Sequence, residues 1–441
     1  MIDSERLIKA QEEAHDENVV LVSGSANRPE NSGRNQEAVR VKLGLAISSS
    51  EYEPSNIERI RQEYLAKKTV TFRAEQFRDE VVEFEVVDVV MLPEASASLF
   101  DEALTESLEL GNRSLNSNSI FIVVDIGGGS TDIAAMQGVE VMPSSEEVYY
   151  IGANSALEEI ALRVETKYNL EFGYLDSDYM DLMLRYPVPF CEKCGKTDKN
   201  PGPCACGGEF QLRRNILKLG NRAVDISDIV NDVYEEKADK LAEIFIRYSD
   251  RLFRTRGINK TQLDNVVFSG GGSEIFYEYV KERIQSSVGS FVEIIKSDKP
   301  TWKVLNGLSK YVLFKEKRAN KNFDRYIFVD PGNFNLKAKC ADSEGNDVIK
   351  PIVMLTKTAA PLEKTTLSVR KPNPMMDLDL DIQTVGGKKP GDGRFFVSYL
   401  ANKGRNPKSR DMLIPKMSDD ITNTMVNAAI GVVLARDKAR G

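Results

Sequence analysis

Histidine is almost absent from the 441-residue sequence, in which His15 is the only one. With a single histidine, catalysis built on a histidine base is disfavoured. Long apolar runs are missing too, since none approaches the ~18 residues of a membrane span. The first residues, MIDSERLIKAQEEAHDE, contain no apolar stretch of the kind found in a signal peptide. We therefore expect a cytoplasmic protein with no membrane partner.

An excess of basic charge is also missing. The chain has 59 Lys and Arg against 67 Asp and Glu, a net charge of -8, which disfavours a generally basic binder of nucleic acid or membrane surfaces. A local basic patch stays open, because one segment carries the basic residues Lys193, Lys196, Lys199, Arg213 and Arg214. They could contact an acidic partner or DNA, although a solvated basic face is the simpler interpretation.

Cysteine is scarce outside that same segment. Four of the five cysteines follow the spacing Cys191-x2-Cys194-x9-Cys204-x-Cys206, two close pairs typical of tetrahedral thiolate coordination. We predict a structural zinc site, because four protein ligands leave no position open for catalysis. The alternatives are two disulfides, which a reducing cytoplasm opposes, and unligated thiols, which leave the adjacent glycines unexplained. The fifth, Cys340, fits a small buried apolar residue.

Strand and helix signals alternate along the chain, which predicts an α/β fold. At about 150 residues per domain, the length suggests about three domains, or two large ones with an insertion. Apolar runs predict strands at 39–47, 81–92, 120–125, 265–268 and 326–330. Helical spacing predicts helices at 54–67, 94–110, 153–167, 226–248, 302–315 and 421–435. Residues 361–390 are expected to be rich in loops, and KEKRANKNFDR, which follows Phe314, is expected to be a linker.

Three glycine-rich turns each follow an apolar strand: DIGGGSTD at Asp125–Asp132, SGGGSE at Ser269–Glu274, and DPGNFNLK at Asp330–Lys337. Glycines let main-chain N–H groups approach a phosphate with no Cβ in the way, and a carboxylate at a strand end can hold magnesium or its waters. None of the turns matches the P-loop or the dinucleotide fingerprint. We therefore expect a nucleotide site of another design.

These motifs resemble those of a known superfamily. DIGGGSTD is similar to the phosphate-2 loop, SGGGSE to the adenosine loop and DPGNFNLK to the phosphate-1 loop of the actin, Hsp70 and sugar-kinase ATPases. SSSEYEPSNIERIRQEY, VMLPEASASLF, YIGANSALEEI and VLNGLSKY most resemble segments of the ParM-type plasmid-segregating bacterial actins. The resemblance implies an actin-like α/β fold, with two ribonuclease H-like domains and a nucleotide cleft between them.

The order of the motifs differs from that family. Phosphate 1 comes first in these ATPases, whereas here it begins at Asp330, after the other two motifs. Moving residues 326–441 ahead of residue 1 restores the family order, so we predict a circular permutant. A fragment of a tandem array is the rival explanation, and it predicts no closed nucleotide site in the monomer. The implied domains are 326–441 with 1–110 as domain I, and 111–325 as domain II with a cysteine-rich insertion at 188–210.

The resemblance also implies roles for single residues. Asp125 and Asp330 would position Mg²⁺ through its waters, and Glu94 would orient the attacking water. Glu94 could instead be a carboxylate that interacts favourably with the dipole of the helix that begins after Pro93. The turns would offer amides to the phosphates and the sugar side, and Lys337 would neutralise phosphate charge. The residues expected to bind the nucleotide are Gly127, Gly128, Gly129, Ser130, Gly270, Gly271, Gly272, Gly332, Asn333 and Lys337.

The function that the resemblance implies is an ATPase that polymerises with ATP (or GTP) and Mg²⁺ and moves plasmid DNA. Its partners would be further copies of itself and a DNA-binding adaptor, with no general DNA binding of its own. A non-polymerising chaperone-like or reactivase ATPase, or a phosphotransferase, is the main alternative. A nucleotide-sensing adaptor whose cysteine insertion binds a partner is a third.

Overall fold

The computed structural model describes most of the chain from residue 38 onward. The described residues are 38–72, 80–109, 111, 119–137, 140–175, 177–198, 200–219, 222–316, 323–332, 335–355, 357–360, 377–385, 393–398, 405–409 and 420–440. They fall into two compact units: Asn154–Leu241 belongs to one, and Gln36–Ala153 with Ala242–Gly441 forms the other.

The larger unit contains a ten-stranded sheet, whose order is β18-β17-β16-β1-β3-β2-β20-β21-β19-β22. β16, β17 and β18 are antiparallel neighbours, and β1 lies parallel to both β16 and β3. The bounds of these five strands are β16 Arg325–Pro331, β17 Asn335–Asp342, β18 Ile352–Leu355, β1 Val39–Ile47 and β3 Val81–Pro93. The remaining strands are β2 Lys67–Phe72, β20 Asp377–Thr384, β21 Gly393–Ser398, β19 Lys357–Ala360 and β22 Arg405–Ser409.

A six-stranded sheet in the same unit repeats this arrangement. Its order is β15-β14-β4-β5-β6, with β7 also paired to β5. β4, β5 and β6 are antiparallel neighbours, and β14 lies parallel to both β4 and β15. The bounds are β4 Ile120–Ile126, β5 Thr131–Gln137, β6 Glu140–Val141, β7 Glu147–Tyr149, β14 Leu263–Ser269 and β15 Glu293–Lys296. Each sheet thus has a three-stranded antiparallel part joined to two parallel strands, and the predicted actin-like fold of two similar α/β halves is confirmed.

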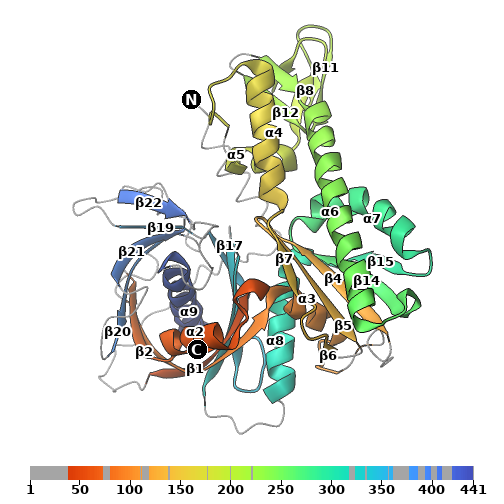
Figure 1. The fold of residues 1–441 in the computed structure, drawn as a ribbon. Helices are drawn as coiled ribbons and strands as arrows, with labels where there is room; N and C mark the ends of the chain where they lie inside the picture. The colour runs from red at the N-terminus through yellow and green to blue at the C-terminus, as the bar shows by residue number, and fades with distance from the viewer. Residues whose placement is uncertain are drawn as a thin grey trace. The chain divides into compact units, whose positions relative to one another are not determined.

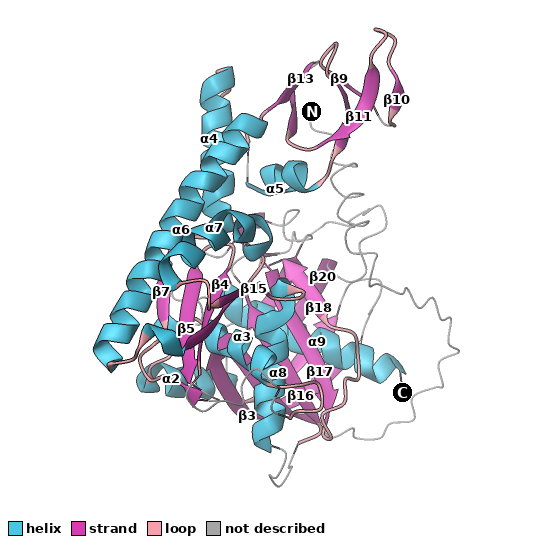
Figure 2. Ribbon diagram, turned by 90° about the vertical axis from the view of Figure 1, so that its right-hand side faces the viewer, coloured by secondary structure: helices cyan, strands magenta, loops and turns pink. Residues whose placement is uncertain are grey.

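Two helices lie between these sheets, as Figures 1 and 2 show. α3, Glu94–Ala103, packs on β4 and β5, while α8, Lys303–Glu316, packs on β1 and β16. The two helices also pack closely against each other. α9, Asp420–Arg440, covers β16 and β17, and its buried side chains join α2, Pro54–Tyr64, in the core of the ten-stranded half. α7, Ser273–Val288, lies on β14 and β15.

The smaller unit contains α4, α5 and two small sheets. α4 is Ala153–Tyr168 and α5 is Ser177–Arg185, while α6, Ser227–Arg256, begins in this unit and ends in the larger one. The first sheet has the order β10-β11-β8-β9, with bounds Gly202–Pro203, Glu209–Arg213, Val188–Cys191 and Lys196–Thr197. The second is the hairpin of β12, Ile216–Leu219, and β13, Arg222–Asp225. Short 3-10 helices complete the chain at η1 Ser49–Glu51, η4 Lys260–Gln262 and η5 Pro300–Trp302.

Most predicted elements are present, and four predictions are corrected. The helix predicted at 94–110 ends at Ala103, because Leu104 is extended and a lysine from α8 binds carbonyl oxygens at the end of α3. The helix predicted at 54–67 ends at Tyr64, and the helix predicted at 226–248 continues to Arg256. The region expected to be loops contains β20, in which Asp and apolar residues alternate. Among the described residues, no helix combines the length and apolar character needed to cross a membrane.

The crossing of α3 and α8 is possible only with glycine at position 307. A Cβ there would overlap the carbonyl oxygen of Ala97 and lie 2.8 Å from the amide nitrogen of Asp101. The two helix backbones therefore touch directly at this point. Because α8 rests on one sheet and α3 on the other, this contact joins the two halves.

We predict that Gly307→Ala destabilises the protein. Glycine-to-alanine changes inside a helix ordinarily stabilise by about 1 kcal/mol, whereas overpacking at this crossing should lower the free energy of unfolding by about 2 kcal/mol or more. Urea denaturation measures whether the free energy of unfolding rises or falls. Asn306→Ala, one residue earlier in α8 and half-buried, is the control and should change stability little. A stabilised Gly307→Ala variant would show that the helices do not cross this closely.

Candidate functional site

Three acidic residues meet where the equivalent strands β4 and β16 end. Asp125 lies at the end of β4 and Asp330 at the end of β16, and both are buried. Glu94 is the first residue of α3, and it is also buried. The pKa of Asp125 is raised to about 6, mainly by burial and further by the charges of Glu94 and Asp330. The fold thus brings together the three carboxylates that the sequence proposes as catalytic or magnesium-binding.

Two serines hold the Asp125 carboxylate in place. The Ser98 hydroxyl donates to Asp125 Oδ2 at 2.8 Å, and Ser98 Oγ lies 3.1 Å from Ser269 Oγ. Ser98 is one helical turn after Glu94, and Ser269 is the parallel-strand neighbour of Asp125. Both serines are fully buried and oppose the rise in the pKa of Asp125. Sequence reasoning missed them, and the four-residue spacing from Glu94 to Ser98 is the signal that could have indicated one.

Each strand-end aspartate faces a polar residue across its hairpin. Asp330 pairs with Lys337 on β17, and Lys337 Nζ lies 2.9 Å from Asp330 Oδ2 in a partly buried ion pair. Asp125 occupies the same place in the other half and faces Asp132 on β5. Ser130 Oγ donates to Asp132 Oδ2 at 3.1 Å. Asp132 is therefore a cross-strand neighbour of Asp125, and the two halves differ in charge at equivalent positions.

Two of the glycine turns pack directly on each other. The amide of Gly272 donates to the carbonyl oxygen of Ile126 at 2.7 Å. Gly270 has φ +79°, and a Cβ there would lie 2.7 Å from Asp125 Oδ1. Gly152, which sequence reasoning did not include, supports the first turn, since its Cβ would lie 2.7 Å from the carbonyl carbon of Gly128. The contact brings Gly127–Ser130 and Gly270–Gly272 to one place beside Asp125.

The third turn is only partly described. The amide of Gly332 donates to the carbonyl oxygen of Asp330 at 3.0 Å, which keeps this glycine beside the aspartate. Asn333, proposed from the sequence as a phosphate ligand, lies outside the described residues. The donor set fits a divalent cation with phosphates, because carboxylate oxygens suit magnesium while amides and a lysine suit phosphate oxygens.

The smaller unit holds the four cysteines of the predicted metal site. The Sγ atoms of Cys191, Cys194, Cys204 and Cys206 all lie within 4.8 Å of one another, and none forms a disulfide. The separations Cys191–Cys206 and Cys194–Cys204 are both 3.6 Å, close to the ~3.8 Å expected for thiolates around tetrahedral zinc. A Cβ on Gly208 would lie 2.8 Å from Cys191 Sγ. This group of thiolates could hold a metal ion.

Comparison with known proteins adds a likeness of fold. No family model matches the sequence, and no curated protein matches it. Among solved structures, the chain is similar to Ta0583, an archaeal actin homologue, with 15% identity over 65% of this chain and 72% of that chain and a TM-score of 0.44. It is also similar to an Alp12 filament structure, with 21% identity over 63% of this chain and 68% of that chain and a TM-score of 0.35.

A third similar structure is a Bacillus thuringiensis ParM hybrid protein with ADP that contains two ParM mutants. The identity is 12%, over 90% of this chain and 50% of that chain, with a TM-score of 0.41.

We predict that Asp125→Asn stabilises the protein above pH 6 in cation-free buffer. The pKa of Asp125 is about 6 when folded and ordinarily 3.8, so the folded state binds more protons between pH 4 and 6 and stability falls as the pH rises through that window. Asparagine avoids this loss, which amounts to about 3 kcal/mol at pH 7. Denaturation in EDTA at pH 4 and pH 7.5 measures the difference in the free energy of unfolding between the variant and the parent.

The control for this experiment is Asp298→Asn, which changes an exposed carboxylate and should leave the pH dependence unaltered. An Asp125→Asn variant whose stability changes equally at both pH values would contradict the raised pKa of Asp125.

Proposed function

We propose that this protein is an actin-like ATPase that binds Mg-ATP at the three strand-end turns and hydrolyses it. The observation that carries the proposal is the convergence of Asp125, Asp330 and Glu94 beside two glycine turns that touch each other. Buried carboxylates that repel one another are unfavourable for the fold, and such groups gather at functional sites. A bound divalent cation would offset that repulsion.

The geometry suggests separate roles for the strand-end aspartates and the glycine turns. Asp125 and Asp330 would hold the cation through its waters, while the amides of Gly127–Ser130 and Gly332 would face the β- and γ-phosphates. Gly270–Gly272, at the start of α7, would face the α-phosphate and sugar. When bound, magnesium supplies charge stabilisation at the phosphates.

Two side chains of the site are proposed to act on the reaction directly. When nucleotide binds, Lys337 would give up part of its contact with Asp330 and contact the phosphate oxygens instead. Glu94 would orient the attacking water and accept a hydrogen bond from it. Its place at the first residue of α3, after Pro93, is equally suited to a carboxylate that stabilises the helix dipole, so the two roles need to be separated by mutation.

We further propose that the ATPase forms filaments that move plasmid DNA through a DNA-binding adaptor. The support is the resemblance of VMLPEASASLF, YIGANSALEEI and VLNGLSKY to ParM-type proteins. A non-polymerising ATPase or a phosphotransferase would use the same site without assembly. ATP-dependent sedimentation and negative-stain microscopy separate these possibilities, because only the filament proposal expects polymer that appears with ATP and decays as phosphate is released.

The repeated topology supports a circular permutation. In the six-stranded sheet the chain enters the antiparallel strands β4–β6 first and the parallel strands β14 and β15 later. In the ten-stranded sheet it enters β1 and β3 first and the equivalent antiparallel strands β16–β18 later. A circular permutation that moves β16–β18 to the end of the chain would produce this difference in strand order. Calorimetric titration should give one ATP per isolated monomer, whereas the tandem-array explanation predicts none.

We infer that the four cysteines hold a structural zinc ion. Protein purified without chelator should contain one zinc per chain by atomic absorption, and Cys194→Ser should lower this content and the unfolding temperature of the smaller unit. ATP binding should persist, because none of the proposed nucleotide-binding residues lies in Asn154–Leu241. Cys340→Ala is the control and should retain zinc. Full stability of the metal-free protein would argue against a structural ion.

We predict that Glu94→Gln separates ATP binding from hydrolysis. Glutamine keeps the size of the side chain and removes its ability to take up a proton, so phosphate release should fall by about 100-fold or more while ATP affinity stays within about threefold. If the filament proposal is right, this variant should give longer-lived polymer. Hydrolysis at the parental rate would mean that Glu94 only stabilises the start of α3.

A further inference from the structure

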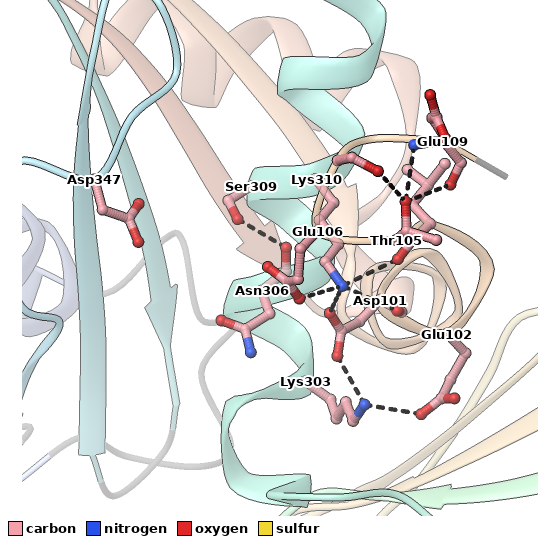
Figure 3. A network of polar contacts seen from close by, with 12 residues as sticks. Asp101, Glu102, Thr105, Glu106, Glu109, Lys303, Asn306, Ser309, Lys310 and Asp347 are labelled. Atoms are coloured by element: carbon pink, nitrogen blue, oxygen red, sulfur yellow. Dashed lines mark hydrogen bonds and ion pairs between the residues drawn. The ribbon is translucent and has the colours of Figure 1, made fainter. Parts of the chain in front are cut away.

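A cluster of charged side chains, most of them buried but with Glu106 exposed, joins the C-terminal end of α3 to α8. Three acidic residues from α3 and the turn after it, Asp101, Glu102 and Glu106, meet Lys303 and Lys310 of α8 (Figure 3). We call these five residues the helix clasp. Lys303 Nζ lies 2.8 Å from Asp101 and 2.9 Å from Glu102, and Lys310 Nζ lies 2.7 Å from Asp101 and 2.9 Å from Glu106.

Lys310 also terminates α3. Its ammonium donates to the carbonyl oxygen of Leu104 at 3.0 Å and contacts that of Asp101 at 3.3 Å. These carbonyls belong to the end of the helix, where no further turn supplies N–H donors. A cation at this end also interacts favourably with the helix dipole. The lysine of α8 thereby determines where α3 stops.

Stability alone does not account for so many buried charges. Asp101, Lys303 and Lys310 have side chains that are only 5 to 12% exposed. Taking ions out of water opposes folding, and well-packed apolar side chains commonly stabilise such a position equally well. What ion pairs with directional hydrogen bonds add is a defined geometry. The clasp is therefore suited to fixing the position of α3.

The clasp is connected to the candidate site at both ends. Ser297 Oγ donates to Glu102 at 3.0 Å, and Pro300, just before α8, accepts from the amide of Gly270 at 3.2 Å. The segment that enters α8 thus contacts the second glycine turn. At the opposite end of α3 lie Glu94 and Ser98, the residues next to Asp125.

We propose that Lys303 and Lys310 are positioning residues that hold α3, and with it Glu94 and Ser98, in register with the second glycine turn. The proposal rests on the proposed function only in assigning Glu94 to hydrolysis; the positioning of α3 is independent of it. The expected behaviour differs from that of a stabilising ion pair, because a loss of register impairs the chemical step more than nucleotide binding.

The test compares Lys303→Met with Lys303→Arg in the full chain. Lys303→Met leaves Asp101 paired with Lys310 and Glu102 bonded to Ser297, so the variant should fold. Without nucleotide, hydrogen exchange at residues 94–98 should rise by about tenfold. With ATP, kcat should fall by about tenfold while KM changes by less than about threefold. Arginine keeps the cation and can contact both carboxylates, so Lys303→Arg should restore both readouts.

Lys42→Met is the matched control. Lys42 is also a buried lysine between two carboxylates, but it joins Asp88 of β3 to Glu316, the last residue of α8, and these two ion pairs include no residue of α3. It should lower the unfolding temperature without changing exchange at residues 94–98. Unchanged exchange there in Lys303→Met, or an equal rise in Lys42→Met, would overturn the proposal whatever the ATPase activity. If exchange rises in Lys303→Met but the parental chain shows no ATPase activity, the positioning role of the clasp stands and the proposed function is refuted.

Discussion

The position of α3 between the two sheets is the constraint on which the site depends. The helix contacts β4 and β5 with one side and α8 with the other, and Gly307 lets the two helix backbones touch. Its first residue, Glu94, thereby reaches the end of β4, and Ser98 reaches Asp125. A helix displaced by the width of one methyl group could keep most of its apolar contacts, but it would lose the hydrogen bond to Asp125.

The polar interactions of α3 and its neighbours serve opposite purposes at its two ends. At the C-terminal end, lysines face the acidic residues Asp101 and Glu102, so buried charge is compensated. At the N-terminal end, Asp125 is surrounded by Glu94 and Asp330, and burial raises its pKa to about 6. The first arrangement fixes geometry, and the second leaves negative charge for a ligand. A compensated cluster is able to hold the helix where an uncompensated one would push it away.

The sequence predicts the strands of the site better than the contacts between them. β4 and β16 are apolar runs that end at an aspartate and a glycine, so periodicity and turn residues were sufficient. β20 was missed because its alternating Asp and Leu residues lie among proline and glycine turns. The end of α3 was missed because Lys310, about two hundred residues later, determines it. Ser98, Ser269 and Gly152 lie inside segments that the sequence singles out, but their roles arise only when three separate segments meet.

The two halves share a topology, but one residue makes them chemically different. Seven residues after the strand-end aspartate, across the first hairpin, one half has Lys337 and the other has Asp132. With two identical hairpins the site would be strongly acidic and would repel a phosphate. Lys337 neutralises Asp330 and leaves Asp125, with Glu94, as the part that favours a cation. Since Lys337 can reach a phosphate only by giving up some of its contact with Asp330, ligand binding would release a second carboxylate for the cation. The difference at this one position therefore gives the site a positive side at Lys337 and a negative side at Asp125 and Glu94.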